Sequence, residues 1–80
     1  MAQFKAFQCV YADTPGGNTR LIVEEYHHGW IFGAVDKRTK QLMDKASVPS
    51  LEKGKEQAEH WAVGSGFITP QDALEWKPWP

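Results

Sequence analysis

The chain has 80 residues and a formal net charge of −1, from 9 basic and 10 acidic side chains. This length gives one domain with no room for a second core, and a hydrophobic content of 41% excludes a disordered tail. The balanced charge argues against a nucleic-acid binder, because such proteins neutralise phosphates with an excess of basic side chains. We therefore expect a single domain over residues 1–80, with frayed ends at 1–3 and 77–80.

Four strands are predicted in the first half of the chain. Runs of strand-forming residues occupy 4–11, 20–27, 30–36 and 41–45. They are separated by a loop with proline and glycine at 12–18, a tight turn at His28-Gly29 and a polar loop at 36–40. Consecutive strands with such short connections pair with their neighbours, which predicts an antiparallel meander.

One helix is predicted from Leu51 to about Val63. Ser50 is a suitable N-cap, and Glu52 places an acid in the first turn. Gly64 is the residue type preferred just past a helix end, so we expect the helix to stop there.

An apolar stripe with helical spacing marks the face of this helix that packs on the sheet. Its members are Leu51, Gly54, Ala58, Trp61 and Ala62. A glycine inside a helix costs about 1 kcal/mol relative to alanine. Gly54 is therefore expected where the helix backbone approaches the sheet closely, over Trp30 or Phe32.

The C-terminal segment fits two structures. Residues 69–72 form a good helix start, with a cap, a proline and an acid in sequence. By contrast, Leu74, Trp76 and Pro78 alternate with polar residues, as in an edge strand. We expect a helical turn followed by an extended tail, with the edge strand as the alternative. The predicted fold is thus α+β, an antiparallel four-stranded sheet with one main helix on one face and this short C-terminal element.

Both faces of the predicted third strand are apolar. Phe32 and Ala34 point to one face of the sheet, and Ile31 and Val35 point to the other. The one long helix covers only one of these faces. The second face is therefore expected to be covered by the tail, by a partner protein, or by a second copy of the chain in a homodimer.

Two tail tryptophans and three helix glutamates are the candidate protein-binding residues. Trp76 and Trp79 lie near a chain end, where large aromatic rings dock onto the domain or onto a partner. Glu52, Glu56 and Glu59 form an acidic row that faces away from the apolar stripe. Lysines interleave with this row, so a solvated surface is the simpler interpretation, and presentation to a basic partner is the functional one.

No catalytic, metal or cofactor motif stands out. Metal-ligating residue types gather only at Glu24, Glu25, His27 and His28, with His60 far along the chain. Adjacent strand positions do not provide the three or four converging ligands of a metal site. We expect a protein that is not an enzyme and holds neither a metal nor a cofactor.

Cysteine usage and the N-terminus bear on the compartment. Cys9 is the only cysteine, which excludes an internal disulfide and fits a reducing environment. The N-terminus lacks the long apolar run of a signal peptide or a membrane span. We expect a cytoplasmic protein without membrane contact.

A basic hairpin supports the alternative of a nucleic-acid-binding module. Its residues are Lys37, Arg38, Lys40 and Lys45. In element order, the segment from Leu21 to Val63 resembles the sheet-plus-helix DNA-binding modules of plant AP2 factors and tyrosine-recombinase arm domains. This resemblance implies nucleic-acid contact through the sheet, whereas the adjacent Glu24 and Glu25 depart from such a basic surface.

The favoured function is a small, non-enzymatic protein that binds another protein. In size and in its lack of catalytic motifs the chain resembles phage-borne modulators such as anti-CRISPR proteins. That resemblance implies an inhibitor that occupies a surface of its partner, using carboxylates where the partner is basic.

Overall fold

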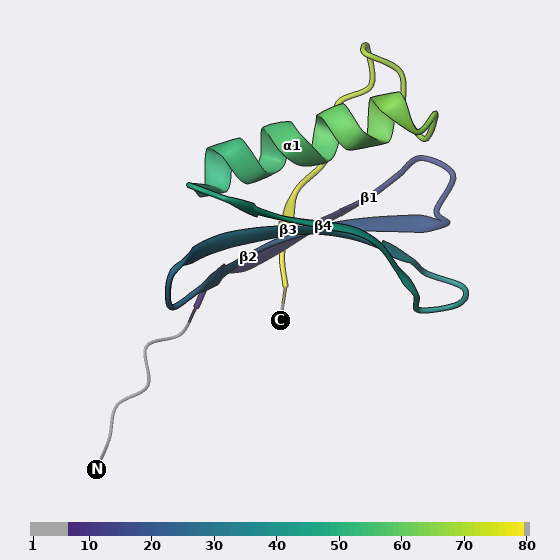
Figure 1. The fold of residues 1–80 in the computed structure, drawn as a ribbon. Coiled ribbons are helices and arrows are strands. Elements are labelled where there is room, and N and C mark those ends of the chain that lie inside the picture. Colours follow the sequence, from purple (N-terminus) through teal and green to yellow (C-terminus); the bar gives the residue numbers. More distant parts are fainter. Residues whose placement is uncertain (1–6, 80) are drawn as a thin grey trace.

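The computed structural model describes residues 7–79 as one five-stranded sheet with one helix packed on it (Figure 1). The elements are β1 (Cys9–Asp13), β2 (Thr19–Tyr26), β3 (Gly29–Asp36), β4 (Leu42–Val48), α1 (Leu51–Gly64) and β5 (Lys77–Pro78). The sheet order is β4-β3-β2-β1-β5, and all neighbouring strands are antiparallel. The predicted α+β meander is confirmed, and the C-terminal element is the edge strand.

The first and fourth strands differ most from the predicted ranges. β1 runs on to Asp13, because Ala12 is fully buried opposite Leu21. β4 runs on to Val48, because Val48 and Ala46 pack against the core. The predicted start of the first strand, at residues 4–6, lies outside the described residues.

The core lies between α1 and one face of the sheet, which we call the helix face. Leu21 and Phe32 are its largest buried side chains from the strands, and Ala58 and Ala62 face them from α1. These alanines let the helix lie close to the sheet, so that Phe32 and Leu21 fill the space between the two layers.

Gly54 is buried where α1 approaches the sheet, as its position on the stripe predicts. A Cβ atom at this position would lie 2.5 Å from Cγ1 of Val23 and 3.3 Å from Cγ2 of Val48. The close approach is confirmed, but the neighbours are these two valines on β2 and β4, not Trp30 or Phe32. The first turn of α1 therefore crosses the sheet over Val23 and Val48.

The helix begins and ends where the sequence predicts, at Leu51 and Gly64. The Ser50 side chain accepts a hydrogen bond from the backbone N–H of Lys53 at 3.2 Å, so Ser50 is the N-cap. The predicted stop at Gly64 is confirmed, but the residue with the left-handed backbone is Gly66, at φ 81°, two residues past the helix end. Its N–H and that of Phe67 return to carbonyls of the last turn, and the Phe67 ring stacks on Trp61 at 5.4 Å, which completes a Schellman motif.

The C-terminal segment crosses from the helix side of the sheet to the opposite side at its β1 edge (Figure 1). A single turn is present at residues 69–72, where the Asp72 N–H donates to the Thr69 carbonyl at 3.0 Å and the Asp72 carboxylate accepts from the Thr69 N–H at 2.8 Å, and the chain then extends to β5. Leu74 and Trp76, which are two residues apart, both pack against the core, as expected of an extended segment and not of a helix. Lys77–Pro78, where fraying is expected, pairs with β1 as β5, while residues 1–3 and Pro80 lie outside the described part.

Candidate protein-binding site

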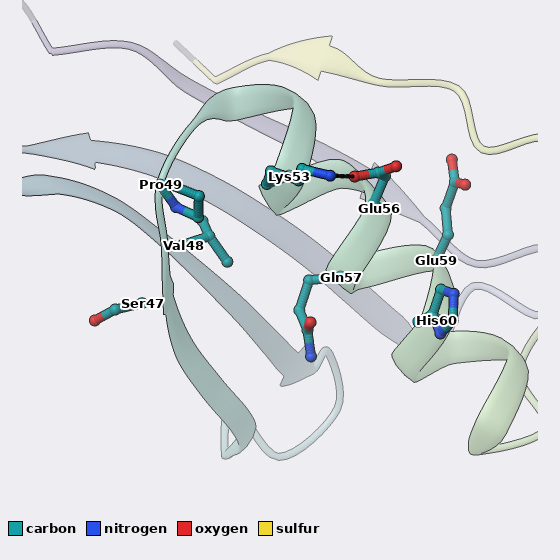
Figure 2. A pocket seen from close by; sticks show the side chains of 8 residues that line it. All are labelled: Ser47, Val48, Pro49, Lys53, Glu56, Gln57, Glu59 and His60. Atoms are coloured by element: carbon teal, nitrogen blue, oxygen red, sulfur yellow. Dashed lines mark ion pairs between the residues drawn. The ribbon is translucent and has the colours of Figure 1, made fainter.

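A cleft of about 610 Å³ lies between β4 and α1 (Figure 2). The end of β4 contributes one wall, from Ser47 to Pro49. The exposed side of α1 contributes the other wall, with Lys53, Glu56, Gln57, Glu59 and His60. Figure 2 shows the Gln57 side chain directed into the space between the two elements. The cleft therefore joins the side of a helix to the margin of the sheet.

The outer edge of β4 has no neighbouring strand among residues 7–79. The backbone N–H of Lys45 points away from β3 and donates to its neighbour Asp44, at 2.8 Å from Oδ1. Inward and outward N–H groups alternate along an antiparallel strand, so the N–H of Ser47, a residue that lines the cleft, also points outward from the sheet. An outward N–H at a strand edge is a hydrogen-bond donor for an added strand.

The charges on the helix wall are mostly acidic. Lys53 and Glu56 form an ion pair at 3.2 Å, and both side chains are well exposed, so this pair adds little stability. Glu59 has no ion pair within the described chain. Glu59 and His60 also border a second hollow of about 420 Å³ beside Pro70. The two hollows share Glu59 and His60 and together form a groove along the helix, with the Glu59 carboxylate near the middle of the groove.

The structure separates the five candidate binding residues. Glu56 and Glu59 line the cleft, whereas Glu52 is exposed on α1 outside it. Trp76 packs against the core, and Trp79 lies on the far side of the sheet. The helix row and the tail tryptophans therefore do not form one surface.

Sequence reasoning missed several residues that line the cleft. Ser47 and Pro49 were not singled out, because the predicted fourth strand ended at residue 45, whereas β4 runs on to Val48. Gln57 and His60 follow from helical spacing beside Glu56, since positions three and four apart share a face. The free edge is a property of strand order alone.

The face of the sheet opposite α1, the open face, carries an anchored aromatic and charged cluster at its β1 side. The Arg20 guanidinium lies 4.4 Å from the centre of the Tyr11 ring and 5.1 Å from that of Trp79. Asp13 holds Arg20 in place with bonds to Nε at 2.8 Å and Nη2 at 3.1 Å, and it accepts from Nζ of Lys37 at 3.2 Å. Trp79 thus docks onto its own domain.

This cluster gives a pH-dependent contribution to stability. The hydrogen bond from Arg20 is the main cause that lowers the pKa of Asp13, opposed by burial and assisted by Lys37. A folded pKa below the unfolded value stabilises the fold above the usual aspartate range and loses this effect as the pH falls through the folded pKa.

Asp13→Asn is expected to lower the free energy of unfolding by about 1 kcal/mol at neutral pH, after allowance for solvent screening of this partly exposed group. The difference from wild type should shrink as the pH falls through the folded pKa of Asp13, which lies below its usual value, because Asp13 itself is then protonated. Urea unfolding at neutral pH and at a series of acidic pH values measures this, and a difference that stays constant with pH would contradict the role given to the carboxylate.

The predicted basic residues do not form one patch. The charge of Lys37 is balanced by Asp13. Arg38 and Lys40 are exposed in the β3–β4 loop, where Asp36 accepts from the backbone of Arg38. Lys45 lies farther along β4, beside Gly33 in register.

Among residues 7–79, no three histidine, cysteine or acidic side chains come together as metal ligands. Burial, assisted by the charge of Glu24, raises the pKa of the Cys9 thiol, which keeps it in the less nucleophilic protonated form. The same part of the chain has no helix long and apolar enough to cross a membrane.

No protein-family model, curated protein or solved structure matches this chain. The fold is that of a small α+β domain in which one helix covers an antiparallel sheet.

Proposed function

We propose that this chain is a non-enzymatic protein-binding domain that takes an extended segment of a partner protein into the cleft between β4 and α1. By occupying that segment it acts as a modulator or inhibitor of the partner, in the manner of the phage-borne proteins that it resembles in size. The observation that carries the proposal is the outward N–H at the unpaired edge of β4, beside a cleft of about 610 Å³.

Strand addition is a general mode of peptide recognition. The main chain of the added segment bonds to the free edge, and side-chain pockets beside it give specificity. In this cleft, Ser47 would offer the main-chain donor and Gln57 an amide that reaches into the space. Glu59, which has no ion pair within residues 7–79, favours a lysine or arginine on the partner.

The experiment is affinity capture from a lysate of the source cells after nuclease treatment, with wild type and two cleft variants. Ser47→Pro removes the outward N–H, and proline is tolerated on an edge strand because its missing donor does not face the neighbouring strand. The double variant Glu56→Lys and Glu59→Lys reverses the charge of the helix wall. We expect one protein to be retained stoichiometrically by wild type and lost from both variants.

Matched controls make the result specific. Ser47→Ala keeps the backbone N–H, and Glu52→Lys makes one such charge reversal on α1 outside the cleft. Both should retain the partner, and circular dichroism should show that all variants are folded. Retention of the partner by both cleft variants, or capture of no protein at all, would contradict the proposal.

The same experiment decides the nucleic-acid alternative. Material that is recovered only without nuclease would shift the function to Arg38, Lys40 and Lys45, whose side chains are exposed. Binding of DNA or RNA through these residues would also fall steeply with added salt.

A further inference from the structure

We propose that the open face of the sheet binds the same face of a second copy of this chain, forming a two-fold symmetric dimer. This surface is separate from the cleft between β4 and α1. The inference is drawn from an apolar hollow at the centre of the open face and from the position of two charges around it.

The hollow has a volume of about 290 Å³ and lies over Gly33 on β3. Ile22, Ile31, Val35 and Leu42 surround it from β2, β3 and β4. The Leu42 side chain is 57% exposed although it leans toward Gly33. An apolar surface contributed by three adjacent strands is typical of a protein interface.

The C-terminal tail does not cover this hollow. Trp79 contacts Tyr11 and Arg20 at the β1 side of the face, and none of these three residues lines the hollow. Within residues 7–79, β5 is also confined to the β1 edge, at the far end of the strand order from β4. The centre of the open face is thus exposed in the single chain.

Glu24 and Lys45 lie at opposite corners of the hollow. Glu24 is in register with Ile31, and Lys45 is in register with Gly33, two residues farther along β3 on its other side. Strand spacing and rise place their backbones about 12 Å apart, with the centre of the hollow between them. Neither side chain forms an ion pair within the described chain, so an acid and a base stand across an apolar centre without partners.

This arrangement is complementary to itself. A two-fold axis that lies between two stacked sheets, perpendicular to the line from Glu24 to Lys45, places each Glu24 over the Lys45 of the other copy. The strands then cross at a steep angle, as in orthogonal sheet packings, and the Ile31 side chain of each copy faces the hollow of the other. A second copy therefore matches both charges and both hollows with one symmetry operation, as an isologous interface requires.

Sedimentation equilibrium of charge variants tests the dimer. Wild type should approach twice the chain mass at high protein concentration. Glu24→Lys and Lys45→Glu should each weaken self-association roughly tenfold or more, because each places like charges opposite one another twice. An equimolar mixture of the two variants should restore the dimer, because every contact then joins a lysine to a glutamate.

Control variants separate this surface from the rest of the molecule. Glu75→Lys and Arg38→Glu make the same charge changes at exposed residues that do not line the hollow and should leave the dimer intact. The cleft variant Glu56→Lys, Glu59→Lys should also stay dimeric, so failure of the proposed function would not affect this result. A monomeric wild type at the highest concentration, or a mixture that associates no better than the single variants, would overturn the dimer.

Discussion

Gly54→Ala is expected to lower the free energy of unfolding by about 1–3 kcal/mol, although alanine is the better helix former. The added methyl would lie 2.5 Å from Cγ1 of Val23, closer than carbon atoms approach without repulsion. Val23 is fully buried, and its branched side chain has little freedom to rotate away. Either α1 or β2 must shift, which loosens the packing of the first helical turns on the sheet.

Gly64→Ala is the matched control, because it lies in the same helix with nothing within 4 Å of the added Cβ. This change should raise the stability by about 0.5 kcal/mol through helix propensity and reduced freedom of the unfolded chain. Thermal or urea unfolding of the two variants gives the contrast. A stabilised Gly54→Ala protein would show that α1 does not approach β2 as closely as the structure has it.

Trp76→Ala is expected to cost about 2–3 kcal/mol, less than a fully buried tryptophan because the side chain is only half-buried. Trp76 packs against the core from the tail, so its loss also frees the segment that leads to β5. The ring has one defect: its Nε1 is buried without an acceptor in the described chain. Trp76→Phe removes that donor, keeps most of the apolar contact, and is expected to cost less than about 1 kcal/mol.

The second tail tryptophan provides the comparison. Trp79 is 43% exposed and contacts Tyr11 and Arg20 on the open face, so Trp79→Ala should cost about 1 kcal/mol. Unfolding curves of the three variants rank these contributions. Equal effects of Trp76→Ala and Trp79→Ala would contradict the assignment of Trp76 to the core and of Trp79 to the surface.

Local chemistry in the sequence was sufficient for much of the fold. The Ser50 cap, the close approach at Gly54 and the two apolar faces of β3 all follow from residue type and spacing. Each depends on neighbours within one turn or one strand. The meander also follows locally, because its connections are too short for any other order.

Features set by tertiary packing could not be predicted in the same way. The helix ends at Gly64 as predicted, but the left-handed residue that follows it is Gly66, and the stacking of Phe67 on Trp61 accompanies that position. The segment that leads to Trp76 combines a helix start with the alternation of a strand. Packing of Trp76 against the core keeps the end of this segment extended. The cleft depends on how α1 packs beside the end of β4, and this tertiary arrangement is not encoded in either segment alone.

Backbone hydrogen exchange at Ser47, with and without the captured partner, tests the central claim most directly. In the free protein this outward amide should exchange rapidly, whereas the neighbouring Ala46 amide, which faces β3, should be protected in both states. We predict strong protection of Ser47 in the complex, because the added segment accepts its hydrogen bond. An unchanged rate at Ser47, with new protection elsewhere on the molecule, would contradict binding along the edge of β4.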